Sequence, residues 1–124
     1  NNAGQILLAY QEDISKLTVD TSGVYLKVPN KPFVPDKGED LEIEYSVDTG
    51  NSHITLRIFD LAGRLVTTLF DGTVTIVHQP WDGRNTLGEL VPVGTYICHL
   101  EVVNEDTGKR TEKVAPIVVG TVLK

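Results

Sequence analysis

The chain has 124 residues, 40% of them hydrophobic and 23% charged, which is typical of one globular domain rather than a disordered segment. Its net charge of -6 and its scattered basic residues argue against binding to nucleic acid or anionic lipid, which needs a clustered positive surface. The single cysteine, Cys98, excludes an internal disulfide, and no run of about eighteen apolar residues predicts insertion into a membrane.

The first 23 residues are less regular than the rest. Within residues 6–17 the apolar side chains fall on one helical face, which leaves a short helix and a docked linker equally open. Residues 24–28 alternate between apolar and polar side chains, as a half-buried strand does. We therefore predict a linker or N-terminal extension over residues 1–23 and a single domain over residues 24–124.

Alternation with a period of two residues continues through the rest of the chain. It predicts further strands at 41–47, 54–58, 65–70, 74–78, 96–103 and 114–122. Turn signals separate them, including a glycine at position 63 that can adopt the left-handed conformation of a short hairpin. Strands spaced about ten residues apart with turns between them favour an all-β sandwich or barrel.

The stretch from Trp81 to Tyr96 reads WDGRNTLGELVPVGTY and contains several turn signals in succession. Tyr96 stands near the start of a late strand, two residues before Cys98, as in the tyrosine corner of Greek-key sandwiches. If Tyr96, Cys98 and Leu100 point into the core, His99 points away from it. We expect Cys98 to be a buried core residue and not a nucleophile.

Three motifs in this order resemble the FlgD-type immunoglobulin-like domain. They are ITLRIFDLAGRLV at 54–66, WDG at 81–83 and VPVGTY at 91–96. Upstream, NKPFVPDKGED at 30–40 is similar to the entry segment of secreted bacterial relatives. The chain departs from many relatives at 77–78, where Val and His stand ahead of the WDG strand in place of a glycine.

The resemblance implies an immunoglobulin-like Greek-key β-sandwich of about seven strands without a disulfide. It also implies a non-catalytic accessory module, often C-terminal, in a larger secreted or cell-surface bacterial protein. There it would serve as a spacer, a stabiliser, or an assembly or sorting element. The implied partners are other domains of the parent protein and the cell-surface or secretion machinery. A flagellar relative makes hook-cap-like assembly an alternative.

Trp81 is the only tryptophan in the chain, and Asp82, Arg84 and Asn85 follow it closely. These four residues are the candidate ligand-binding site, because an exposed indole with polar neighbours can stack on a sugar ring. A carbohydrate- or protein-binding module is therefore the second functional hypothesis. The competing interpretation places the indole over the open end of the core, with Asp82 accepting backbone N–H groups of its own turn, and the family motif favours it.

The acidic loop at 35–40 is the candidate metal site. Asp36, Glu39 and Asp40 supply the hard oxygen ligands that calcium prefers, although Lys37 intrudes and the spacing does not match an EF-hand. A solvated turn is the favoured interpretation of this loop, calcium binding is the alternative, and we expect no other cofactor.

Other catalytic and cofactor chemistry finds little support in the sequence. The serines lack a nucleophile-elbow setting, the three histidines lack zinc spacing, and the glycines lack the strand-to-helix context of a phosphate loop. We therefore expect no enzymatic activity. The resemblance places the domain outside the cell or on the bacterial cell surface.

Overall fold

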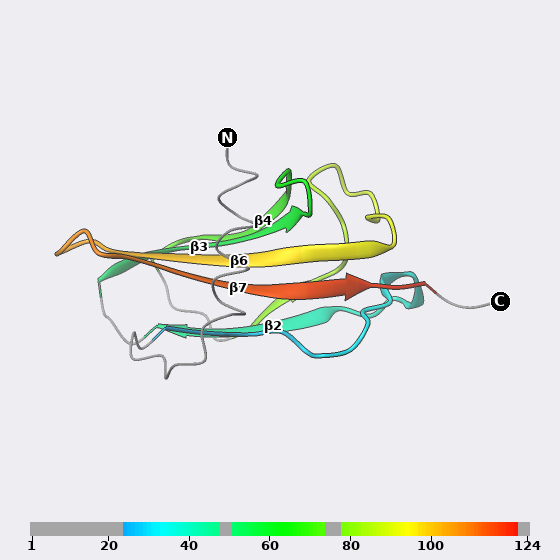
Figure 1. Ribbon diagram of the computed structural model, residues 1–124, viewed down its shortest axis with the longest axis horizontal. Coiled ribbons are helices and arrows are strands. Elements are labelled where there is room, and N and C mark those ends of the chain that lie inside the picture. Colours follow the sequence, from blue (N-terminus) through cyan, green and yellow to red (C-terminus); the bar gives the residue numbers. More distant parts are fainter. Residues whose placement is uncertain (1–23, 48–50, 74–77, 122–124) are drawn as a thin grey trace.

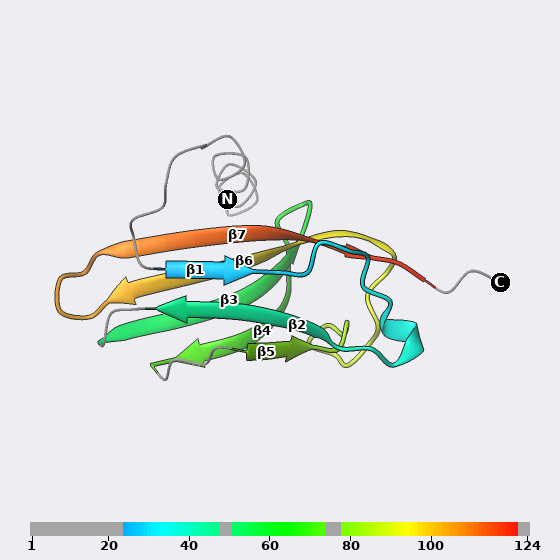
Figure 2. The ribbon, with the colours of Figure 1, turned by 90° about the horizontal axis from the view of Figure 1, so that it is seen from below.

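The computed structural model describes residues 24–47, 51–73 and 78–121, and within them two antiparallel sheets pack face to face (Figures 1 and 2). The three-stranded sheet has the order β1-β2-β5 and the four-stranded sheet the order β4-β3-β6-β7. The strands are β1 (Val24–Lys27), β2 (Leu41–Val47), β3 (Ser52–Asp60), β4 (Leu65–Gly72), β5 (His78–Trp81), β6 (Gly94–Asn104) and β7 (Arg110–Val119). This arrangement confirms the predicted immunoglobulin-like Greek-key sandwich.

The predicted strands agree with the structure in most places. Those at 24–28, 41–47, 54–58, 65–70 and 96–103 correspond to β1, β2, β3, β4 and β6, the last three with wider bounds. The strand predicted at 74–78 is shifted, because β5 spans His78–Trp81 and residues 74–77 lie outside the described residues. The strand predicted at 114–122 begins earlier and ends at Val119 in β7. The predicted extension at 1–23 also lies outside the described residues.

The core lies between the two sheets and follows the alternation of the sequence. Leu41, Ile43 and Tyr45 of β2 are buried in it, and Glu42 between them is exposed. Apolar side chains of β3, β6 and β7 meet them from the four-stranded sheet. Burial of this apolar surface is the main source of stability for a domain that has no disulfide among its described residues.

A short entry segment closes one edge of the sandwich. Phe33 precedes the 3₁₀ turn η1 (Pro35–Lys37) and forms a parallel bridge with Val119 at the end of β7. The Phe33 N–H donates to the carbonyl of Val118 at 2.7 Å, and the Gly120 N–H donates to the carbonyl of Phe33 at 2.8 Å. The segment that leads into the three-stranded sheet is thereby hydrogen-bonded to the last strand of the other sheet.

The outer face of the four-stranded sheet differs from expectation. His99 lies on the face opposite Cys98 and Leu100, as predicted, but it is only 4% exposed. Phe59 and Ile97 are also buried outside the main core cluster. The central strands β3 and β6 therefore carry apolar side chains on both faces, and period-two alternation weakens there. Within the described residues, no helix is long and apolar enough to cross a bilayer.

Candidate functional site

Trp81 ends β5 and fills the core at one end of the sandwich. Its side chain is 2% exposed, and its ring centroid lies 5.7 Å from that of Phe33 and 6.2 Å from that of Tyr96. The indole Nε1–H donates to the carbonyl of Arg84 at 3.0 Å, which satisfies its one polar group. At this exposure the indole is buried, which agrees with the competing interpretation that it covers the end of the core, and sugar stacking on Trp81 stays a prediction.

Gly83 fixes the position of the chain directly after Trp81. Its φ of 79° is left-handed, and a Cβ atom built on it would lie 2.5 Å from Cβ of Pro35. The Val91 N–H donates to the carbonyl of Gly83 at 2.8 Å, which closes the base of the loop that follows. The entry segment and the WDG motif are therefore two halves of one packed corner, which we call the Trp81 corner: Phe33, Pro35, Trp81, Gly83 and Tyr96.

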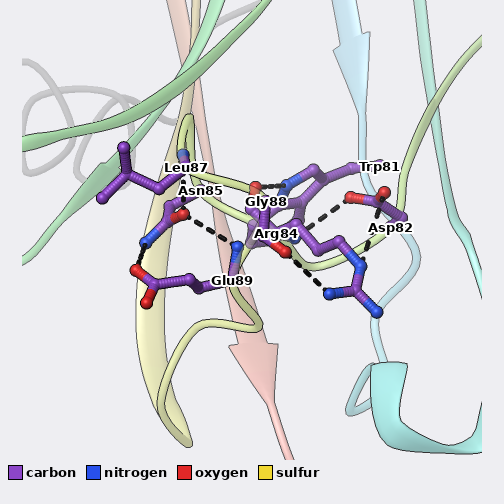
Figure 3. Close-up of polar contacts among 7 residues, drawn as sticks. All are labelled: Trp81, Asp82, Arg84, Asn85, Leu87, Gly88 and Glu89. Atoms are coloured by element: carbon purple, nitrogen blue, oxygen red, sulfur yellow. Dashed lines mark hydrogen bonds and ion pairs between the residues drawn. The ribbon is translucent and has the colours of Figure 1, made fainter.

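Asp82 and Arg84 hold the loop that leaves this corner (Figure 3). Asp82 Oδ1 accepts the Arg84 N–H at 3.1 Å, which confirms the predicted Asx-type arrangement. The Arg84 guanidinium donates from Nη1 to the carbonyl of Gly88 at 2.8 Å. Both side chains bond within their own loop.

Asn85 organises the tip of the loop in the same way (Figure 3). Its Oδ1 accepts the N–H groups of Leu87 at 2.9 Å and Glu89 at 3.1 Å, and its Nδ2 lies 3.4 Å from Glu89 Oε1. Asp82, Arg84 and Asn85 also line a hollow of about 430 Å³ beside the loop. Trp81 lines the same hollow, and ligand binding by these four residues stays a prediction.

Tyr96 joins the loop to the core at its other end. Its hydroxyl donates to the carbonyl of Pro92 at 2.6 Å, four residues upstream, which confirms the predicted tyrosine corner. Burial raises the pKa of the Tyr96 phenol, and the nearby Asp60 carboxylate raises it further. The phenol is therefore protonated at neutral pH and serves as a hydrogen-bond donor.

The hairpin at 60–64 lies at the same end of the sandwich. Asp60 Oδ1 accepts the N–H groups of Ala62 and Arg64, both at 2.9 Å, and Gly63 has the predicted left-handed φ of 82°. Partial burial acts to raise the pKa of Asp60, but the hydrogen bonds and the charge of Arg64 outweigh it and lower that pKa overall. The hairpin is thus fixed by its own carboxylate.

Between this hairpin and the loop lies a hollow of about 490 Å³. Four exposed apolar side chains line it, which we call the apolar rim: Leu61, Leu65, Leu87 and Val93. This surface was not predicted from the sequence, because each of its residues stands in or next to a turn, where an isolated apolar residue has no periodic pattern. The turn signals indicate only that these residues lie near the surface.

The structure does not assemble the predicted calcium site. Asp36 Oδ2 accepts the Thr121 hydroxyl at 2.6 Å, and Glu39 Oε1 accepts the Val34 N–H at 3.3 Å. Over residues 24–47, 51–73 and 78–121, no three histidine, cysteine or acidic side chains form a group that could hold a metal ion. Asp36, Glu39 and Asp40 are consequently not brought together, since the turn directs the first two toward bonds with protein.

Two further titratable residues, Cys98 and His99, are buried in β6. Cys98 is fully buried, and burial raises the pKa of its thiol well above the ordinary range, as expected of a core cysteine. Burial lowers the pKa of His99, although the Glu112 and Glu101 carboxylates act in the opposite direction. The His99 ring meets Phe59 edge-on at 5.8 Å and lies 3.7 Å from Glu112. Both residues belong to the packing of β6.

Comparison with known proteins supports the fold and leaves the family open. No protein-family model matches the sequence, and no curated protein matches it. Among solved structures, the chain is similar to dimeric latent PorU from Porphyromonas gingivalis, with 18% identity over 80% of this chain and a TM-score of 0.60. It is also similar to FlgD from P. aeruginosa, with 20% identity over 80% of this chain and a TM-score of 0.51.

The shares of the matched proteins differ widely. The chain spans 9% of the PorU chain and 76% of the FlgD chain. PorZ, an essential bacterial surface component of the type IX secretion system of Porphyromonas gingivalis, matches at 22% identity and a TM-score of 0.48. That match covers 86% of this chain and 12% of PorZ. The PorU and FlgD matches support the predicted FlgD-like immunoglobulin-like fold.

Proposed function

We propose that this chain is a non-catalytic accessory module of a larger exported bacterial protein, in which it acts as a spacer and assembly element. The observation that carries the proposal is the Trp81 corner. The residues that most resembled a binding site form a packed corner and a loop bonded to itself. Such an arrangement fixes the shape of a module and exposes little reactive chemistry.

Two further observations support this role. In the PorU match the fold occupies 9% of a much longer chain, as an accessory module does. The location outside the cell rests on the likeness of the entry segment at 30–40 to that of secreted bacterial relatives. Within this proposal, the activity of the protein resides in the other domains of the same polypeptide.

Deletion of residues 24–121 from the full polypeptide tests the role. We expect the purified remainder to keep its chemical or binding activity, while the amount exported or assembled at the cell surface falls. A surface-neutral substitution, Thr107→Ser on the exposed β6–β7 turn, is the matched control and should change neither quantity. Loss of activity from a correctly folded remainder would contradict the proposal.

The carbohydrate-binding alternative is tested with the fluorescence of Trp81. As the only tryptophan, it reports on the corner without interference. A buried indole gives blue-shifted emission that iodide does not quench and soluble saccharides do not change. Saccharide-dependent emission that is lost in Arg84→Ala or Asn85→Ala would favour a binding module instead.

A further inference from the structure

β7 is the longest edge strand of the module. The sheet orders place β1, β5, β4 and β7 at the edges, and Figure 2 shows β4 and β7 on opposite sides of the four-stranded sheet. β1 and β5 have four residues each, whereas β7 has ten. The edge of a long strand presents a row of backbone N–H and C=O groups that can pair with a strand of another chain, and folded proteins block such edges.

The other long edge strand, β4, is irregular and partly occupied. Its pairing with β3 shifts register at two places, which twists the edge away from a straight partner strand. Its Val66 carbonyl also accepts the Thr86 N–H of the neighbouring loop at 3.2 Å. β7, by contrast, pairs with β6 in one continuous register from Arg110 to Val119. β7 is therefore the regular edge, where pairing with another strand has to be blocked in a different way.

Hydrogen bonds at both ends of β7 show which of its residues turn their backbone groups outward. The Val118 carbonyl accepts the Phe33 N–H, and the Gly120 N–H donates to the Phe33 carbonyl, so both residues face away from β6. At the hairpin, the Asn104 N–H donates to the Lys109 carbonyl, so Lys109 faces β6. The direction of these groups alternates along an antiparallel strand. Both ends therefore define the same outward row, which consists of Glu112, Val114, Pro116 and Val118.

Pro116 interrupts this row because it has no N–H group. Phe33 already occupies Val118, so the row is open to another strand from Glu112 to Pro116. If β7 paired antiparallel with β7 of a second copy, centred on Val114, residue 116 of each copy would lie opposite Glu112 of the other. Pro116 cannot donate to that Glu112 carbonyl, and a carbonyl buried in an interface without a donor costs free energy.

We propose that Pro116 prevents β7 from pairing with the same strand of a second copy and thereby keeps the module monomeric. The proline does not weaken the sheet itself, since its nitrogen points away from β6, the one position in an edge strand where proline is tolerated. The inference goes beyond the proposed function and does not depend on it, because it concerns the 124-residue chain alone.

The variant Pro116→Val restores the missing donor and tests this block. Valine suits an exposed strand position, and unchanged fluorescence of the buried Trp81 checks that the variant is folded. The mass in solution is followed by sedimentation over a range of protein concentrations, together with hydrogen exchange at the Glu112 and Val114 amides. We expect the parent chain to keep the mass of one copy. Pro116→Val should double its mass as the concentration rises, and exchange at both amides should slow in parallel.

The matched control moves the proline along the outward row. The double variant Glu112→Pro with Pro116→Val contains the same number of prolines as the parent chain. In the same pairing it lacks the hydrogen bond from residue 112 to the carbonyl of residue 116, so it loses as many bonds as the parent does. Glu112 is exposed and its N–H faces outward, which makes proline acceptable there. The double variant should remain monomeric.

Four results would overturn the proposal. The first is a Pro116→Val variant that stays monomeric at every concentration, and the second is a double variant that dimerises as strongly as the single one. The third is association of Pro116→Val without slower exchange at Glu112 and Val114, which would place the contact elsewhere. The fourth is slow exchange at both amides in the parent chain, which would show that this edge is covered whether or not Pro116 is present.

Discussion

The two ends of the sandwich use the same turn chemistry with different packing beneath it. At one end Asn85 Oδ1 accepts two backbone N–H groups of the loop after the Trp81 corner. At the other end Asn104 Oδ1 accepts two N–H groups of the β6–β7 turn, from Asp106 at 2.9 Å and Thr107 at 3.0 Å. The Trp81 corner, from which the first loop leaves, and the β6–β7 turn each contain a glycine with a left-handed φ, namely Gly83 and Gly108.

The difference lies in what each turn rests on. A Cβ atom on Gly83 would meet the entry segment, whereas one on Gly108 would have no atom within 4 Å. The β6–β7 turn extends beyond the sheets at the left of Figure 1, and the Trp81 corner is part of the core. Local hydrogen bonding therefore sets the shape of both turns, but packing decides which of them stabilises the fold.

Alanine at the two glycines measures this difference directly. Gly108→Ala adds only the backbone strain of a left-handed alanine, about 1–2 kcal/mol of unfolding free energy. Gly83→Ala adds the same strain and a collision with Pro35, so we expect a loss larger by about 1–3 kcal/mol. Urea denaturation of both variants and the parent gives these values.

Because φ is 79° at Gly83 and 76° at Gly108, Gly108→Ala is a control for backbone strain alone. Equal losses at both positions would mean that the entry segment yields without cost and that the corner is not a rigid unit. A change in the urea dependence of Gly83→Ala without a change in midpoint would indicate altered compactness instead.

The sequence predicted the elements of the corner whose signals are local. Asp82 bonds to its own turn and Tyr96 to a carbonyl four residues upstream, and both follow from residue type and spacing. The contact between Gly83 and Pro35 joins residues far apart in the chain, so propensity and alternation carry no trace of it. The same limit explains why Asp36 and Glu39 read as calcium ligands, since only the fold shows that each carboxylate meets a protein donor.

The buried outer face of β6 was hidden for a related reason. A histidine between two core residues suggests a solvated face, but His99 lies beside Phe59 and Ile97 in the central part of a four-stranded sheet. Strands at a sheet centre are buried on both faces when both faces are covered, and then the alternation that marks a strand disappears. The position of β6 in the chain was therefore predictable from the sequence, but the burial of its outer face was not.

Substitution of Tyr96 tests how much one hydrogen bond of the corner contributes to the unfolding free energy, and a smaller effect is expected. Tyr96→Phe removes the hydrogen bond to the carbonyl of Pro92 and leaves that acceptor without its phenolic donor, so we expect a loss of about 1 kcal/mol. Tyr25→Phe, which removes an exposed hydrogen bond to Glu44, is the matched control and should leave the urea midpoint unchanged. A larger loss of unfolding free energy for Tyr25→Phe than for Tyr96→Phe would contradict the stabilising role of the corner.

His99 gives the smallest expected effect, and its sign follows from burial. Because burial lowers the pKa of His99 in the folded protein, the unfolded chain binds the proton more tightly between that pKa and the ordinary value of about 6.5. The contribution of neutral His99 to the unfolding free energy is complete above about pH 6.5 and is lost as the pH falls through the folded pKa. His99→Gln should therefore flatten the decline of unfolding free energy on acidification from about pH 8 to pH 5, as measured by urea titrations. The Glu101 and Glu112 carboxylates oppose the shift, so a steeper decline in His99→Gln would show that they, rather than burial, govern the imidazole.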